Sequence, residues 1–361
     1  MMHAMCNMKP LAFLLLALAC RNAAVPAAEQ APSPAPTVSV IASNLEVPWS
    51  IAFPDANRIL VTERPGRVRA IENGKLRAQP LLSLTDVVAT GEAGLMGLAL
   101  HPDYARNRFV YLCYATGDMV DVVVRYRDDG NALVEPATII RNIPAARFHA
   151  GCRLQFGPDR KLYVTTGDAT NGEIAQNLRS LGGKILRVND DGSVPADNPF
   201  PNSPVWTYGH RNPQGIAWDP KSGLLWSTEH GPSGFDGGRG GDEVNIIERG
   251  KNYGWPEIHH RQTRAGMVAP LLEYTPAHAP ASAAFWRGAF YFGCLRGEHL
   301  HRVVVNGREV VKEEELFTNL GRIREVAVGP DGALYFSTSN HDGRGDPADA
   351  DDRIFRVTAR E

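Results

Sequence analysis

Short runs of alternating apolar and polar residues recur along the chain, each followed by a tight turn and a second such run. The first runs begin at Trp49, Leu98, Leu154, Ile216, Ala283 and Val326. The turn is usually rich in Pro, Asp or Gly, as in Leu154-Gln-Phe-Gly-Pro-Asp159. Alternation with a period of two predicts a half-buried strand, and turn residues between two such runs predict an antiparallel pair. The pattern therefore predicts six β-hairpins.

Many of these units end in a third short run that carries a basic residue. Examples are Gly66–Ile71, Lys184–Val188, Leu300–Val304 and Asp352–Val357. Helical periodicity is almost absent, and the repeat length is roughly 45 to 60 residues. We therefore expect an all-β fold, a six-bladed β-propeller of four-stranded antiparallel blades. Thr37–Ile41 is expected to add a strand to the last blade and close the ring. The alternative, a pair of β-sandwiches, does not require the periodic turn.

The N-terminus is predicted to be a targeting segment. Lys9 precedes the apolar run Leu11–Cys20, which is too short to span a bilayer but typical of a secretory signal. We expect a signal peptide at residues 1–28, a Pro/Ala-rich linker at 29–36 and the propeller domain at 37–361, with a periplasmic or secreted product. Cys20 leaves a lipid anchor open as an alternative.

Charge and cysteine content narrow the classes further. The 361 residues carry a net charge of −2, so no nucleic-acid partner is expected. Once the signal peptide is removed, Cys113, Cys152 and Cys294 remain. This odd, widely spaced set predicts neither a disulfide framework nor a zinc site.

Two residues of the third unit have the chemistry of a general base and its partner. His149 precedes the first strand of that unit and Asp168 follows the second. In a propeller both would face the same end of the channel, where a carboxylate can raise the basicity of a histidine and fix its tautomer. The alternative is a structural histidine and an ordinary turn aspartate.

Arginines precede the strands of other units. Arg211 and Asn212 lie before the fourth unit, and an arginine beside an amide suits a developing oxyanion. Arg322 and Arg324 alternate before the sixth unit and are expected on one face, where Arg296 can join them. Such a cluster favours an anionic ligand, although a solvated strand edge is the alternative.

The stretch from Glu229 to Pro256 is rich in glycine and acidic residues. Glycine disfavours regular structure and permits sharp bends, and exposed carbonyl oxygens suit calcium. The alternative is a long disordered surface loop.

Taken together, these motifs resemble the soluble pyrroloquinoline-quinone-dependent glucose and aldose sugar dehydrogenases. The resemblance covers about Leu45 to Val357 and keeps the family's order. It rests on His149 with Gly-Asp168, Arg-Asn-Pro-Gln-Gly215, Glu-His-Gly-Pro232 with Gly-Gly-Asp-Glu243, Lys-Asn-Tyr-Gly-Trp-Pro256 and Arg-Ile-Arg324.

The resemblance implies a role for each candidate near the base. His149 would take the proton of the sugar's anomeric hydroxyl while hydride passes to the quinone, and Asp168 would orient His149. Arg211 and Asn212 would bind the quinone oxygen that gains charge. The cofactor carboxylates would be held by Arg296, Arg322 and Arg324.

The resemblance also implies calcium ligands in the glycine-rich stretch. The carbonyls of Gly231 and Pro232 would bind the calcium that also contacts the quinone. Glu243 and Tyr253 fall on positions that look like a second, structural calcium site.

Three departures from the family pattern stand out. Glu92, placed among the cofactor-binding residues, occupies a position that is usually glutamine. Arg296 stands where lysine is more usual, which keeps the charge but changes the geometry. Ser233–Gly238 looks like an insertion. These departures bear on sugar preference more than on the cofactor.

The predicted activity is the oxidation of aldose sugars to lactones with pyrroloquinoline quinone and Ca2+. A calcium-dependent propeller lactonase is the runner-up. A third alternative is a non-catalytic binding propeller, for which Arg344-Gly-Asp346 is the available adhesion-like motif. The sequence leaves the electron acceptor open, as well as the choice between monomer and homodimer.

Overall fold

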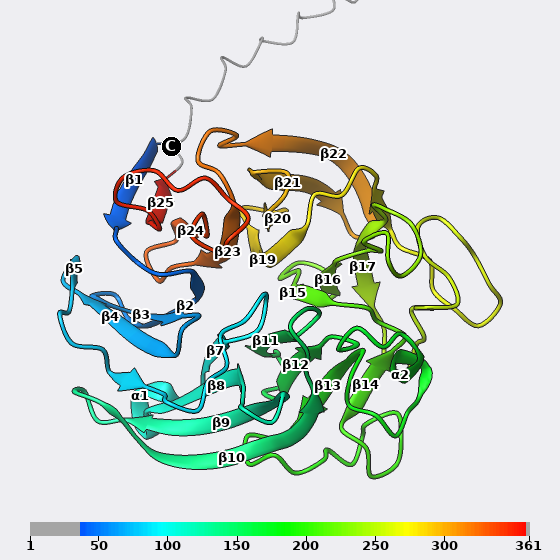
Figure 1. The fold of residues 1–361 in the computed structure, drawn as a ribbon, viewed down its shortest axis with the longest axis horizontal. Coiled ribbons are helices and arrows are strands. Elements are labelled where there is room, and N and C mark those ends of the chain that lie inside the picture. Colours follow the sequence, from blue (N-terminus) through cyan, green and yellow to red (C-terminus); the bar gives the residue numbers. More distant parts are fainter. Residues whose placement is uncertain (1–36, 359–361) are drawn as a thin grey trace, which may run out of the picture.

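A computed structural model describes residues 37–358, so the predicted signal peptide and linker lie outside the described residues. Six antiparallel sheets are arranged as blades around a central axis (Figure 1). The all-β, six-bladed propeller predicted from the sequence is confirmed. Within the described range no helix is both long and apolar enough to cross a membrane.

The first three blades follow one another in chain order. Blade 1 contains β2 (Pro48–Asp55), β3 (Arg58–Glu63), β4 (Arg67–Glu72), β5 (Lys75–Leu76) and the short β6 (Leu82–Ser83). Blade 2 contains β7 (Leu95–Leu100), β8 (Phe109–Ala115), β9 (Val120–Asp128) and β10 (Leu133–Pro144), with helix α1 (Tyr104–Asn107) in the first turn. Blade 3 contains β11 (Gly151–Phe156), β12 (Leu162–Thr166), β13 (Lys184–Val188) and β14 (Val205–Tyr208), with α2 (Glu173–Gln176) between β12 and β13.

The last three blades complete the ring. Blade 4 contains β15 (Pro213–Trp218), β16 (Leu225–Glu229), β17 (Asp242–Ile247) and β18 (Leu272–Tyr274). Blade 5 contains β19 (Pro280–Trp286), β20 (Ala289–Cys294), β21 (His299–Asn306) and β22 (Glu309–Leu316). Blade 6 contains β23 (Ile323–Val328), β24 (Leu334–Thr338), β25 (Ile354–Thr358) and the N-terminal β1 (Thr37–Ala42).

The ring closes through the first and last strands of the chain. β1 pairs antiparallel with β25, in a register that places Val38 opposite Val357 and Val40 opposite Phe355. The predicted closing strand at Thr37–Ile41 is therefore confirmed. Closure removes the free sheet edge that an open array of blades would expose.

Burial explains why the inner strands have the clearest sequence signal. Every residue of β3 and β12 is buried, because neighbouring blades pack on both faces of these strands. Positions along the outermost strand β10 range from buried to exposed, and those of β22 are half-buried or exposed, as expected where one face contacts water. Trp49, Met96, Tyr111 and Leu154 belong to one core cluster that joins blades 1, 2 and 3.

A buried ion pair crosses the axis. Arg153 on β11 donates to Glu325 on β23 over 2.7 Å, and both side chains are about 5% exposed. The same guanidinium donates to Ser50 Oγ at 3.0 Å and lies over the ring of Trp49. The pair therefore links blade 3 to the opposite blade 6 and contacts blade 1.

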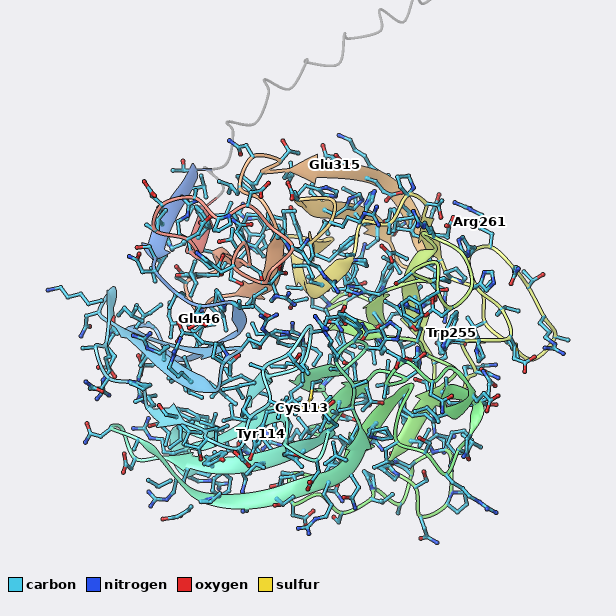
Figure 2. The ribbon with its side chains drawn as sticks, in the orientation of Figure 1. Glu46, Cys113, Tyr114, Trp255, Arg261 and Glu315 are labelled. Carbon is cyan, nitrogen blue, oxygen red and sulfur yellow. A yellow bond between two sulfur atoms is a disulfide. The ribbon has the colours of Figure 1, made fainter. Side chains whose placement is uncertain are left out.

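Two expectations from the sequence need correction. The structure contains a disulfide between Cys113 on β8 and Cys152 on β11, which links blades 2 and 3 (Figure 2). The number and spacing of the cysteines could not predict this disulfide, because the two strands are brought together only by blade packing. The glycine-rich stretch is also not a continuous loop, since β17 crosses it as the third strand of blade 4.

Candidate active site

One end of the ring carries the candidate site. The loop before the innermost strand of a blade and the loop after its second strand lie at the same end, because the two strands are antiparallel. Loops of both kinds from several blades enclose a cavity of about 560 Å³. Its lining includes Glu92, His149, Arg211, Gly231, Pro232, Arg296, Arg322 and Arg324, all of them residues singled out from the sequence.

His149 and Asp168 meet at the wall of this cavity. His149 Nδ1 lies 2.6 Å from Asp168 Oδ1, and both side chains are almost fully buried. Asp168 also accepts hydrogen bonds from Trp255 Nε1 at 2.8 Å and from the backbone N–H of Thr170 at 2.8 Å. Three N–H groups thus fix the carboxylate, and the carboxylate leaves Nε2 as the ring atom of His149 available to a ligand.

Glycine makes this contact possible. A Cβ atom at Gly167 would lie 1.7 Å from the carbonyl oxygen of His149, so only glycine permits the two backbones to approach so closely. His149 itself has a φ of 58°, in the left-handed region that a side-chain-bearing residue seldom adopts. Such strain costs on the order of 1–3 kcal/mol and is found mainly at functional sites.

Glu92 contacts His149 through the backbone. Its Oε2 accepts from the His149 N–H at 2.9 Å and from Asn212 Nδ2 at 3.1 Å, and Arg344 lies 3.4 Å from Oε1. Burial would raise the pKa of Glu92, but His230, the His149 N–H and Arg344 outweigh it and lower the pKa. Asn212 is fully buried and also accepts from the backbone N–H of Gly151 at the start of β11, so it connects Glu92 to the strand that follows His149.

Arg322 and Arg324 form the buried cationic part of the wall. Asp342 lies 2.8 Å from Arg322 and 3.3 Å from Arg324, and all three side chains are less than 10% exposed. Burial lowers the pKa of Arg324 to about 10, which leaves it charged at neutral pH. Burial would raise the pKa of Asp342, but the two arginines outweigh it and lower the pKa. Two guanidiniums share one carboxylate, so this wall retains positive charge for an anionic ligand. The third arginine of the predicted set, Arg296, lines the rim and is exposed.

Arg211 is engaged by the segment that looks like an insertion. Its Nε donates to Asp236 at 2.8 Å and its NH2 group donates to Ser233 Oγ at 2.9 Å. From the same segment, the ring of Phe235 stacks on His149 with 5.9 Å between centroids. Ser233–Gly238 thus contacts both His149 and Arg211 at the cavity.

The four predicted calcium ligands border a second, much smaller cavity of about 10 Å³, the size of one ion or water molecule. Gly231 and Pro232 also line the large cavity, so they lie between the two. A Cβ atom at Gly231 would lie 2.2 Å from the carbonyl oxygen of Gly241, so glycine is required at this close approach.

The donor set at the small cavity fits a hard cation. Glu243 pairs with Glu229 across β17 and β16. Burial, with the charge of Glu229, raises the pKa of Glu243 well above its ordinary value. The hydroxyl of Tyr253 already donates to the carbonyl oxygen of Ile246 at 2.7 Å. The backbone carbonyl of Tyr253 is therefore the group that can bind a cation. Neighbouring carboxylates and carbonyls are the ligands that Ca2+ prefers.

Several site residues were not assigned a role from the sequence. Trp255 lay within a quoted motif, but its bond to Asp168 joins segments far apart in the chain. Asp342 and Arg344 follow β24, where no repeat signal marks them. His230 also lines the cavity, and its Nε2 is buried without a hydrogen-bond partner among the described residues. An unpaired buried nitrogen at a cavity wall is available to a bound ligand.

Fold and site together define a propeller enzyme with a carboxylate-held histidine facing a cationic cavity. The glucose/sorbosone dehydrogenase family model matches residues 45–346, so the chain belongs to this family. The family resemblance read from the motifs is confirmed.

The relatives agree with this assignment. Aldose sugar dehydrogenase YliI of Escherichia coli is 35% identical over 92% of this chain and 96% of that protein. Quinoprotein glucose dehydrogenase B of Acinetobacter calcoaceticus is 32% identical over 61% of this chain and 52% of that protein. The PQQ-bound form of aldose sugar dehydrogenase from Streptomyces coelicolor is 36% identical, with a TM-score of 0.82, over 91% of this chain and 99% of that chain.

Proposed function

We propose that the protein oxidises the anomeric hydroxyl of aldose sugars to the lactone, with pyrroloquinoline quinone and Ca2+ as cofactors. The observation that carries the proposal is the His149–Asp168 pair at a cavity whose wall holds Arg322 and Arg324. Family membership and the cofactor named for the Streptomyces coelicolor relative support it. They favour a dehydrogenase over a propeller lactonase.

When bound, the quinone supplies the carbonyl that accepts hydride, and calcium polarises that carbonyl. The chain's own residues do the rest. His149 accepts the proton of the anomeric hydroxyl at Nε2, and Asp168 stabilises the imidazolium that forms. Arg322 and Arg324 hold the carboxylates of the cofactor, with Arg296 at the rim. Once Asp236 is displaced, Arg211 can donate to the oxygen of the cofactor that gains negative charge.

The metal ligands fall on one segment. Gly231 and Pro232, which line both cavities, would offer carbonyl oxygens to the cofactor ion, and Glu243 with the Tyr253 carbonyl would hold a structural ion at the small cavity. His230 Nε2 remains as a further polar contact for the cofactor.

The proposal also includes export of the protein. The apolar run in residues 1–28 is typical of a secretory signal, which implies a periplasmic or secreted enzyme. The mass of the mature protein recovered from the periplasm tests this. Removal of about 28 residues is expected, whereas a full-length chain would contradict export by cleavage, and a lipid-modified Cys20 would identify the anchored form.

One titration separates a quinoprotein from a lactonase. The purified apoprotein is titrated with pyrroloquinoline quinone in Ca2+ or in excess chelator while cofactor absorbance is followed, and reduction of an artificial dye is then measured with several aldoses. We expect calcium-dependent saturation at one equivalent and dye reduction with at least one sugar. Saturation without dye reduction by any aldose would refute the sugar dehydrogenase proposal.

A substitution tests the base. His149→Gln should abolish turnover and leave the cofactor titration nearly unchanged, because Nε2 acts on the substrate. His101→Gln is the matched control, since His101 lies outside the cavity, with its Nε2 3.3 Å from Asp190. Wild-type turnover in His149→Gln would remove His149 from the mechanism.

A further inference from the structure

Three histidines and a cysteine converge in blade 5, outside the residues assigned to the sugar site. Their ligating atoms all lie within 4.8 Å of one another, and the residues are His278, Cys294, His299 and His301. Cys294, His299 and His301 are less than 5% exposed. We infer that these four side chains form a closed binding site for one Zn2+ ion.

The hairpin of β20 and β21 sets the geometry of three ligands. Cys294 and His299 are directly opposite in the antiparallel register, so their side chains lie on the same face of the sheet. His301 is two residues further along β21 and shares that face. His278 comes from the segment before β19, and its ring lies 5.1 Å from that of His299, edge to face. Figure 1 shows β20 and β21 side by side in this blade.

The hydrogen bonds fix which nitrogen atoms are free. His299 Nδ1 lies 2.9 Å from the carbonyl oxygen of Gly297, which can only accept, so Nδ1 carries the proton. His301 Nε2 lies 2.9 Å from a carboxylate oxygen of Glu313, so this nitrogen is the donor there. The lone pairs of His299 Nε2 and His301 Nδ1 therefore face each other.

Those two nitrogens are only 3.1 Å apart. Facing lone pairs repel at that distance, so the two nitrogens must share either a proton or a metal ion. Neighbouring ligand atoms of a tetrahedral zinc site with bonds of about 2.0 Å are about 3.3 Å apart, close to this spacing.

His278 adds an independent sign of a missing partner. Its Nδ1 is buried and makes no hydrogen bond to any residue the structure describes. Its ring stacks on Tyr274 with 4.8 Å between centroids, and the Tyr274 hydroxyl donates to the same Glu313 that faces His301. A carboxylate behind a ligating histidine is the usual second partner at zinc sites.

Donor type and charge favour zinc over calcium. Three imidazole nitrogens and one thiolate sulfur form a borderline-soft donor set, whereas calcium takes oxygen ligands. On binding, the Cys294 sulfur forms a bond to the metal and its proton leaves to solvent. The thiolate and Glu313 together balance the two charges of the ion. Glu315, labelled on β22 in Figure 2, lies 4.0 Å from His299.

The site lies directly behind the wall of the large cavity. Ala277 and Ala279, on either side of His278, line that cavity, as do Leu295 and Arg296 after Cys294. A bound ion would tie these two wall segments together and hold Arg296 at the rim.

Metal binding is the test, and it does not depend on sugar oxidation. Mature protein stripped with a chelator is titrated with Zn2+ against a chromophoric competitor, in excess Ca2+ so that oxygen-lined sites are filled. We expect one equivalent with a dissociation constant of about 50 nM or tighter, and a rise in Tm. Co2+ in place of Zn2+ should give tetrahedral visible bands and a thiolate charge-transfer band.

Variants localise the ion. Cys294→Ser and His299→Gln should lose the tight equivalent, and Cys294→Ser should also lose the charge-transfer band. His260→Gln is the matched control, because His259 and His260 form another histidine pair, 2.7 Å apart, and this variant should retain the equivalent. If the site variants fail to fold, the wild-type titration still decides. No tight equivalent, or Co2+ bands without a thiolate transition, would overturn the proposal, as would a preference for copper alone.

Discussion

The hydrogen bonds of Asp168 give the sharpest prediction about the base. The carboxylate accepts from His149 Nδ1, Trp255 Nε1 and the N–H of Thr170, and has no donor of its own. Asp168→Asn supplies one acceptor atom and two donor hydrogens. Whichever way the amide is turned, at least one N–H donor faces another donor.

The expected loss follows from two contributions. Removing the charge weakens the hydrogen bond that stabilises the imidazolium, worth about 1.5–3 kcal/mol, or about 10- to 100-fold in rate. An unsatisfied buried donor adds about 1–3 kcal/mol, either as lost stability or as a wrong tautomer of His149. We therefore expect kcat to fall between about 100-fold and 10,000-fold, with cofactor titration nearly unchanged.

A second substitution separates the two contributions. Asp168→Asn combined with Trp255→Phe removes the tryptophan donor, so the amide oxygen can turn to His149 and Thr170. Thermal stability should recover and kcat should rise about tenfold above the single variant, while the missing charge keeps it at least about tenfold below wild type. Steady-state dye reduction and denaturation measure both. A single variant within threefold of wild type would refute the role of Asp168, and a double variant no better than the single would refute the donor conflict.

Three further predictions concern the surroundings of the site. Asp236→Asn should lower the cofactor concentration at half-saturation by about three- to tenfold, because Arg211 is released from its ion pair with Asp236. Weaker cofactor binding in this variant would mean that Asp236 assists cofactor binding. Glu325→Ala should reduce the free energy of unfolding by about 3–5 kcal/mol, since Arg153 is left buried and unpaired, whereas the double replacement with methionine should be near wild type in denaturant titrations. The disulfide between β8 and β11 closes a separation of 39 residues. Reducing it should lower the free energy of unfolding by about 4 kcal/mol in the chain-entropy account. An unchanged denaturation midpoint in reductant would contradict this.

The predicted hairpins match the structure where alternation and turn residues are both clear in the sequence. The hairpins beginning at Trp49, Leu154 and Val326 became β2–β3, β11–β12 and β23–β24 because alternation and turn residues are local signals. The third strand of blade 4 was not predicted, because the glycines before Asp242 interrupt the alternating pattern.

The site was predictable as a set of residues but not as an arrangement. His149, Asp168 and the arginines could be selected because each flanks a strand, and antiparallel strands bring such flanks to one end. Two contacts could not be predicted from the sequence: Arg211 with Asp236, and Asn212 with Glu92. The first contact joins the loop before β15 to the loop between β16 and β17, and the second joins the loop before β15 to the loop before β7.

The sequence by itself determined the repeated hairpins, the number of blades and the residue types with catalytic chemistry, because these depend on periodicity and composition within a few residues. Only the tertiary structure decided the disulfide, the Trp255–Asp168 bond and the cluster of His278, Cys294, His299 and His301. Each of these depends on how two strands or blades face one another. That facing is set by packing over the whole ring, which no short window of sequence contains.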